Sequence, residues 1–355
     1  MTVDWKPIED LPPLKQSTSV RLLNERTEQW VKVREQLEAR EMDKTPLEIW
    51  LSERNRSFAI GTGEVEGLYT LKRGITEQLI TEGLHGIESS HTFEDIDRST
   101  LQGLLADQEE TLKTVFDMVK NDVPLSHYSI RGLHAKITEH QDTATGIDPF
   151  GRHTHMPLLK GQYKLRPNNP RRPDGEIHPY CPPEQTHGEM ERLLTMHREH
   201  EKANVDMIAE AAWLHHRFAQ IHPFQDGNGR IARLLMAYVF VKEGGFPPVV
   251  SPANRDQYID ALERADEGDL QLFVDFLADE SSRSAVRAIT IGDNIVRGVN
   301  RYIHANRGVT IDNQYFPPGT PEADGLHLPL ETDIEEKEVT DKGRPKNDDD
   351  HSIDL

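Results

Sequence analysis

The stretch His222–Arg233 reads HPFQDGNGRIAR and decides how the rest of the chain is interpreted. Apolar residues recur at helical spacing on both sides of it, over 207–221 and over 231–239. Between these segments, Gly227 and Gly229 allow the backbone to turn sharply and to approach a ligand closely. We therefore predict a tight loop between two buried helices.

The side chains of this loop suit a reaction in which an activated hydroxyl attacks a polyphosphate. A second helix starting at about 228–230 would point its unpaired N–H groups into the loop, which favours an anion there. His222 is a base near neutral pH, and Asp226 is a carboxylate suited to Mg²⁺. Arg230 and Arg233 can each fork onto phosphate. The alternative is a polar loop with a hydrogen-bonded histidine and surface arginines, but it does not explain why all these features coincide.

The stretch resembles the signature of the Fic (filamentation-induced-by-cAMP) family, His-x-Phe-x-Asp/Glu-Gly-Asn-Gly-Arg-x-x-Arg, without a substitution. The resemblance extends from about residue 57 to residue 280. It implies a mainly α fold, a Fic-type helical bundle with a small β-hairpin flap. It also implies that the protein binds ATP with Mg²⁺ and transfers AMP to a Ser, Thr or Tyr hydroxyl of a target protein.

The resemblance further implies a role for each residue of the motif. His222 would be the general base that acts on the target hydroxyl, and Asp226 would hold Mg²⁺ against the phosphates. The anion cradle and the phosphate contacts would come from Gly227, Asn228, Gly229, Arg230 and Arg233. In this assignment Arg233 would pair with the γ-phosphate.

A second stretch, Thr62–Gly67 (TGEVEG), takes its meaning from this resemblance. On its own it indicates only a helix end with Gly67 as the cap. Many Fic proteins, however, carry an inhibitory helix with the pattern Ser/Thr-x-x-x-Glu-Gly/Asn, here Thr62, Glu66 and Gly67. The chain thus resembles the self-inhibited class with an N-terminal inhibitory helix, in which Glu66 would pair with Arg233. Because glycine weakens a helix interior by about 1 kcal/mol, Gly63 suggests a loosely held helix.

A β-hairpin is predicted from two alternating segments, 161–166 and 176–180, which flank a proline-rich turn. In Fic proteins a hairpin at this place is the flap that aligns the target by strand addition. The resemblance therefore assigns Gly161, Tyr163 and Lys164 to target binding. Lys164 stands where the family commonly has Arg, which puts target choice in doubt.

The organisation of the 355 residues follows from these motifs. We expect an N-terminal arm and helices over 1–56, the inhibitory helix and a helical scaffold over 57–127, and the Fic catalytic core over 128–288. The C-terminal extension, 289–355, is expected to be largely a disordered acidic tail. A short helix is predicted there through Ile295 and Ile303.

Composition limits the partners. Lys and Arg number 41 against 61 Asp and Glu, and the net charge of −20 argues against binding to nucleic acid or to anionic membranes. The single cysteine excludes internal disulfides. The sequence has no membrane-length apolar run and no signal peptide, so we expect a soluble, cytoplasmic protein. A homodimer stays open.

Three functions compete at this point. The first is an autoinhibited protein adenylyltransferase, and removal of AMP by the same site stays open. The second is a Fic-fold kinase or another nucleotide-linked transferase. The third is a non-catalytic, ATP-sensing interaction module, although binding alone would not need His222.

Overall fold

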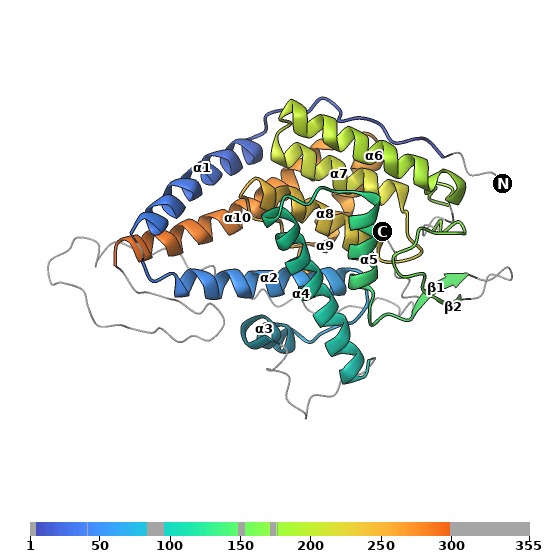
Figure 1. Cartoon of the computed structure of the whole chain (residues 1–355), viewed down its shortest axis with the longest axis horizontal. Coiled ribbons are helices and arrows are strands. Elements are labelled where there is room, and N and C mark those ends of the chain that lie inside the picture. The colour runs from blue at the N-terminus through green and yellow to red at the C-terminus, as the bar shows by residue number, and fades with distance from the viewer. Residues whose placement is uncertain are drawn as a thin grey trace, which may run out of the picture.

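The computed structural model describes residues 5–40, 42–83, 96–147, 153–170, 175 and 177–298. In this part the chain forms a helical bundle with one small hairpin at its side (Figure 1). The helices are α1 (Thr18–Ala39), α2 (Thr45–Val65), α3 (Arg73–Glu82), α4 (Arg98–Lys120), α5 (His127–Ile137), α6 (Pro183–Ala203), α7 (Met207–Ile221), α8 (Asn228–Lys242), α9 (Arg255–Asp266) and α10 (Gln271–Val296). The strands are β1 (Thr143–Ile147) and β2 (His153–Pro157).

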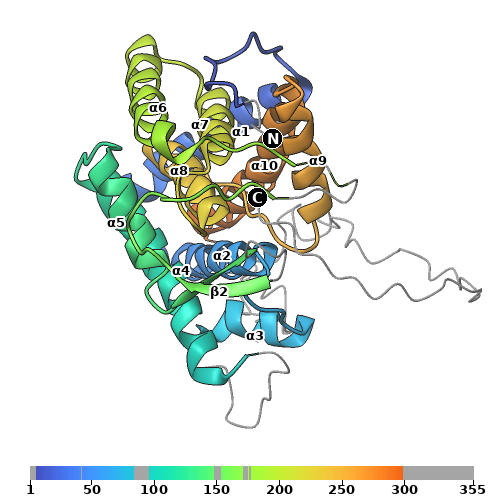
Figure 2. The same ribbon diagram turned by 90° about the vertical axis from the view of Figure 1, so that its right-hand side faces the viewer.

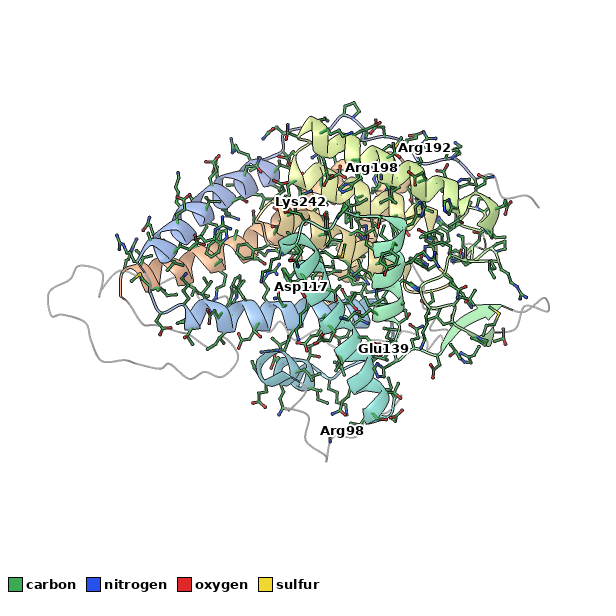
Figure 3. The ribbon with its side chains drawn as sticks, viewed as in Figure 1. Arg98, Asp117, Glu139, Arg192, Arg198 and Lys242 are labelled. Carbon is green, nitrogen blue, oxygen red and sulfur yellow. The ribbon has the colours of Figure 1, made fainter. Side chains whose placement is uncertain are left out.

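Helices α7 and α8 form the centre of the bundle, as the apolar periodicity on either side of the loop predicts. Every residue of α8 from Asn228 to Phe240 is buried. A helix buried on all its faces needs neighbours on all sides. Helix α8 packs against α2, α4, α5 and α7, while α6, α9 and α10 cover α7. Charged side chains such as Asp117, Glu139 and Arg198 lie on the outside (Figure 3).

The N-terminal arm has no regular structure before α1, as predicted, but it is firmly attached. Ile8 is fully buried, and its N–H donates to Glu189 on α6 at 2.9 Å. The Glu9 carbonyl accepts a hydrogen bond from Trp213 Nε1 on α7 at 3.0 Å. The arm therefore lies against both α6 and α7, at the top of the bundle in the view of Figure 2.

Helix α10 corrects the prediction for the C-terminal region. The sequence predicts that helical order fades near 288 and resumes in a separate short helix. Instead α10 continues unbroken to Val296, because Ala285, Ala288 and Ile291 pack with Trp30 of α1 in one apolar cluster. The expected boundaries at 56 and 288 both fall within continuous helices, α2 and α10. The predicted acidic tail and Ile303 lie outside the described residues.

The hairpin also lies at a different place from the predicted one. The antiparallel pair β1–β2, with Thr143 opposite Pro157, lies before both of the predicted segments. The predicted segments, 161–166 and 176–180, do not form a ladder in the part that the structure describes. Pro179 lies within the second of these segments, and a proline has no N–H to donate to a neighbouring strand. The backbone of the first segment bonds to the central loop: the Lys164 N–H donates to the Pro223 carbonyl at 2.8 Å.

The last turns of α2 are tightly packed, contrary to the expectation from their glycines. A Cβ on Gly61 would lie 2.3 Å from the Val250 carbonyl oxygen, and one on Gly63 would lie 2.2 Å from the Tyr69 hydroxyl. Tyr69 is buried, and its hydroxyl donates to the Ile60 carbonyl at 3.2 Å. The glycines therefore allow close approach and do not loosen the helix.

Within the described residues, no helix combines the length and the apolar character needed to cross a membrane.

Replacing Gly61 tests this close approach. Gly61→Ala is expected to lower the free energy of unfolding by about 1–3 kcal/mol, because the new methyl group overlaps a backbone carbonyl. Gly188→Ala is the matched control. Gly188 is exposed on α6, and a Cβ added there would meet nothing within 4 Å, so alanine should raise stability by about 0.5–1 kcal/mol. Urea denaturation measures both, and equal effects would contradict the packing account.

Candidate functional site

The loop 222–227 joins α7 to α8, as predicted. His222 ends α7 in the left-handed conformation, with φ of +50°, and its N–H donates to the Phe218 carbonyl at 2.9 Å. Gly227 precedes α8 with φ of +79°, a conformation that favours glycine. No side chain caps the start of α8, so its first N–H groups are available to an anion.

His222 is held as a neutral base. Its ring stacks on Tyr180 with centroids 3.7 Å apart and planes 6° apart, and only 4% of the residue is exposed. Nδ1 donates to the Ala219 carbonyl at 3.2 Å, which leaves Nε2 as the unprotonated nitrogen. Burial, reinforced by the charge of Lys164 and by His178, holds the pKa of His222 well below its ordinary value. The imidazole is therefore ready to accept a proton.

Asn228 closes the loop with its side chain. Its Oδ1 accepts the Phe224 N–H at 2.8 Å, and its Nδ2 donates to the Phe224 carbonyl at 2.9 Å. The family resemblance predicts Asn228 in the anion cradle. In the structure the side-chain amide of Asn228 bonds to the loop backbone, so only the backbone N–H of Asn228 is at the start of α8.

His134 joins α5 to this loop in a structural role. Nδ1 accepts the Gly161 N–H and Nε2 donates to the Asp226 carbonyl, both at 2.9 Å. The ring stacks on Phe224 with centroids 3.8 Å apart. Full burial lowers the pKa of His134 to about 4, so it remains the neutral tautomer that these two bonds require.

Arg230 Nη2 lies 3.6 Å from Asp226 Oδ1, and Gln141, a residue that no sequence motif indicates, bonds to both side chains. Gln141 Nε2 donates to Asp226 Oδ2 at 2.5 Å, and Gln141 Oε1 accepts from Arg230 Nη2 at 2.6 Å. The Gly227 N–H donates to Asp226 Oδ1 at 2.5 Å. Arg230 is fully buried, and its Nε has no hydrogen-bond partner among the described residues.

The Arg233 guanidinium is fully buried and is bound from two helices. Nη2 donates to Glu66 Oε1 at 2.6 Å and to the Thr62 carbonyl at 3.1 Å, while Nε donates to Thr62 Oγ1 at 3.2 Å. From α9, the Tyr258 hydroxyl accepts from Nη1 at 3.2 Å. The structure thus brings Thr62, Glu66 and Arg233 together, and Tyr258 is an additional member of the group.

The end of α2 fixes the position of Glu66. Gly67 follows with φ of +70°, and its N–H donates to the Glu64 carbonyl at 3.1 Å. The Leu68 N–H donates to the Gly63 carbonyl at 3.1 Å, which completes a glycine-terminated helix end. Glu66 stands at the last turn with its side chain 6% exposed. The carboxylate is therefore directed at Arg233 by the backbone and not by a mobile side chain.

The three residues assigned to the flap face inward. Gly161 has φ of +66°, and its carbonyl accepts from Arg131 Nε at 2.7 Å. The Tyr163 hydroxyl lies 2.8 Å from His127 Nδ1 on α5, and Lys164 is buried against the loop. Leu165, at 75% exposure, is an apolar side chain of this segment that faces solvent. Target binding by Gly161, Tyr163 and Lys164 stays a prediction.

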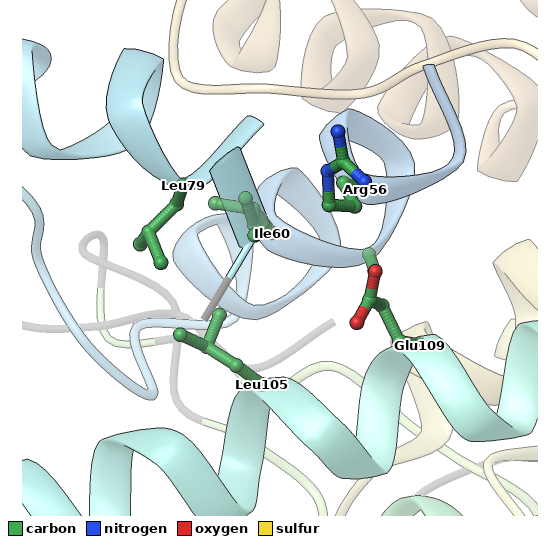
Figure 4. Close-up of a pocket in the computed structure, with 7 residues that line it drawn as sticks. Arg56, Ile60, Leu79, Leu105 and Glu109 are labelled. Carbon is green, nitrogen blue, oxygen red and sulfur yellow. The ribbon is translucent and has the colours of Figure 1, made fainter. Parts of the chain in front are cut away.

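A hollow of about 230 Å³, its open mouth included, lies between α2, α3 and α4 (Figure 4). It is lined by Arg56, Ala59, Ile60, Leu79, Gly83, Leu105 and Glu109. Arg56 is already engaged by the Ile80 and Thr81 carbonyls at the end of α3. None of the lining residues belongs to the loop or to the partners of Arg233, so we assign the chemistry to the loop.

The part of the chain that holds this site is similar in sequence to known proteins. Residues 124–240 match the model of the Fic/DOC family. This part of the chain is therefore similar to a Fic domain. The matched range includes the loop, Arg233 and the segment 161–164, whereas Thr62 and Glu66 lie before it.

Two curated relatives of the Fic domain are protein adenylyltransferases. The chain is 36% identical over 119 residues to protein adenylyltransferase fic-1 of Caenorhabditis elegans, a match that covers 32% of this chain and 23% of that protein. It is 43% identical over 77 residues to protein adenylyltransferase Fic of Aedes aegypti, covering 22% of this chain and 15% of that protein. The matches therefore span a quarter or less of these relatives.

The fold of the Fic domain and of the helices around it is shared with a solved structure. A Fic domain containing signaling protein from Bacteroides thetaiotaomicron superposes with a TM-score of 0.59 at 23% identity, covering 78% of this chain and 97% of that chain. The predicted mainly α, Fic-type bundle with a small hairpin is confirmed.

The lowered pKa of His134 predicts how the stability of the fold changes with pH. Its pKa of about 4 in the folded chain lies below the value of about 6.5 in an unfolded chain, so the unfolded state binds more protons between these values. Stability is therefore lost as pH falls from 6.5 toward 4. His134→Gln removes this contribution, and its stability deficit relative to the unmodified chain should shrink by about 1–2 kcal/mol between pH 7 and pH 5. Denaturation at both pH values measures this, and a constant deficit would refute it.

Proposed function

We propose that the protein is a protein adenylyltransferase that transfers AMP from ATP to a Ser, Thr or Tyr hydroxyl of a target protein. The observation that carries this proposal is a neutral, buried base, His222, six residues from a helix start that no side chain caps. Relatives of the Fic domain that carry the name protein adenylyltransferase support it.

In the proposed reaction His222 Nε2 removes the proton of the target hydroxyl. The hydroxyl oxygen forms a bond to the α-phosphorus of ATP, and the bond from that phosphorus to the bridging oxygen breaks, so that pyrophosphate leaves with the electron pair. The N–H groups at the start of α8, together with Arg230 and Arg233, would hold the phosphates. The unpaired, buried Nε of Arg230 fits a site that accommodates an anion.

Mg²⁺ fits this site through Asp226. The described residues contain no group of three or more His, Cys, Asp or Glu side chains suited to a metal. Mg²⁺, however, is commonly held by one carboxylate together with substrate phosphates. When bound, the ion would supply positive charge to the phosphates. The bonds from Gln141 and Gly227 orient the Asp226 carboxylate and leave it further lone pairs.

We further propose that Glu66 keeps the enzyme inhibited. Its carboxylate takes an N–H of Arg233 that a γ-phosphate would need, and it places a negative charge beside that position. Removal of Glu66 would leave Arg233 bound to Thr62 and Tyr258, so the guanidinium would stay in place for the nucleotide.

The proposed partner is a target protein, which fits a chain whose net charge of −20 disfavours nucleic acid. The single cysteine, Cys181, is free and buried, and fits the reducing cytoplasm.

The decisive experiment uses the full chain with ATP and Mg²⁺ and reads self-modification by intact mass. Glu66→Gly should gain one or more AMP units, the unmodified chain should gain little, and Glu66→Gly/His222→Ala should gain none. Glu64→Gln is the matched control: it removes a charge from the same helix end without touching Arg233, and should behave as the unmodified chain. A Glu66→Gly protein that binds ATP without gaining mass, with and without candidate targets, would favour an ATP-sensing module. A gain of phosphate in place of AMP would favour a kinase.

The pH dependence of Glu66→Gly tests the state of the base. Because the pKa of His222 is lowered, the imidazole stays neutral as pH falls through 6.5, and kcat/KM should hold its value there. The loss of activity should begin only at a clearly lower pH. Initial rates of AMP transfer between pH 5 and 8 measure this, and a half-maximal rate near pH 6.5 would show that the pKa of the base is not lowered.

A further inference from the structure

The residues that flank His222 are bound by a segment the motif does not include. Lys164 Nζ donates to the Ile221 carbonyl at 3.3 Å, and the Lys164 N–H donates to the Pro223 carbonyl at 2.8 Å. Asn168 Nδ2 donates to the Phe224 carbonyl at 2.8 Å. One five-residue segment therefore binds three carbonyls immediately around the proposed base.

Lys164 and Asn168 are also bonded to each other. Asn168 Oδ1 accepts from Lys164 Nζ at 2.8 Å, so the two side chains form one unit on the loop. Lys164 is only 3% exposed. The ion pairs found among the described residues include none with Lys164. A buried ammonium with carbonyl and amide acceptors in place of a carboxylate is costly, and it persists only where the surroundings require it.

The C-terminus of α7 explains why a buried cation lies here. Ile221 is the last residue of α7, and its carbonyl is one of those that the helix itself leaves without a partner. A cation at this end also interacts favourably with the helix dipole. The next residue, His222, adopts a left-handed conformation that is unfavourable for a residue with a side chain. The Lys164 bond thus holds the backbone where this turn begins.

The charge of Lys164 also bears on the imidazole. Around Lys164 lie His222, the Cys181 thiol and the Tyr180 ring, whose centre is 5.8 Å from Nζ, and His178 acts on His222 as well. Burial lowers the pKa of Lys164 to about 7, while a positive charge there disfavours a second one on His222. The lysine therefore favours the form of the histidine that accepts a proton.

We infer that Lys164, together with Asn168, is a positioning residue for the reaction: it holds the carbonyls on both sides of His222 and keeps the imidazole aimed and neutral. This inference rests on the proposed function for its catalytic consequence, but its structural part does not. Lys164 would thus have a role at the catalytic loop, whereas the family resemblance assigns this position to target binding.

The test compares Lys164→Met, Lys164→Arg and Asn168→Ala in the Glu66→Gly background. Met keeps the length of the side chain and removes both charge and donor. Lys160→Met is the matched control, because Lys160 lies in the same segment but donates to Glu139 and Asp142, away from the loop. Lys164→Met should lower kcat for AMP transfer by about 10–100-fold with the Kd for ATP nearly unchanged, and Asn168→Ala should have a smaller effect in the same direction. Lys164→Arg should restore most of kcat, since it keeps a charged donor.

A second readout does not need activity. NMR titration of histidine-labelled full chain, with His222→Gln to assign the signal, gives the pKa of His222. It should be higher in Lys164→Met than in Lys160→Met. Equal pKa values and equal kcat in these two variants would overturn the inference, and so would a loss confined to the KM for a target.

The two proposals fail in different ways. If Glu66→Gly transfers no AMP, the proposed function fails, while the His222 titration still decides the role of Lys164. If Lys164→Met does not fold, Lys164→Arg and Asn168→Ala test the inference in its place. Full activity and an unchanged His222 pKa in Asn168→Ala would then contradict a joint positioning role.

Discussion

The arrangement of the molecule depends on one buried cation, Arg233. A guanidinium in the centre of a bundle needs acceptors, and here they come from Thr62 and Glu66 at the end of α2 and from Tyr258 on α9. Tyr258 in turn donates to His215, whose pKa is held well below its ordinary value by burial and by Arg233. Residues 171 positions apart in the chain are thereby joined, and α2 is fixed against the central helix α8.

The proposed base and the proposed phosphate-binding groups lie at opposite ends of a short stretch, and each end is supported separately. His222 is supported by Tyr180, Lys164 and the end of α7. Arg233 lies in the second turn of α8 and is bound by α2. Because these supports share no side chain, a carboxylate such as Glu66 can occupy the phosphate end without disturbing the base. The proposed inhibition is therefore a local exchange of anions and does not require the Fic domain to rearrange.

The parts of the site that could be predicted are those written in one continuous stretch. Helical periodicity predicts α7 and α8, and the family resemblance predicts that Glu66 pairs with Arg233. Gln141, Asn168 and Tyr180 could not be found in this way, because each reaches the loop from a distant segment as a single polar or aromatic side chain without a pattern. The alternation within 161–166 and 176–180 does not lead to a hairpin, because the Lys164 N–H bonds to the central loop and Pro179 has no N–H to donate. The end of α10 cannot be predicted from local sequence, because its packing partner, α1, is remote in sequence.

The central claim is that Glu66 and a nucleotide phosphate compete for Arg233. Calorimetric titration of ATP with Mg²⁺ into the unmodified chain and into Glu66→Gln tests it most directly, because Gln keeps the shape of the side chain and removes its charge. A gain in affinity of about tenfold or more is expected in Glu66→Gln, since charge-assisted bonds are the strong ones and the repulsion is removed. The gain should disappear when Arg233→Ala is added. Equal affinity of the unmodified chain and Glu66→Gln would contradict the account.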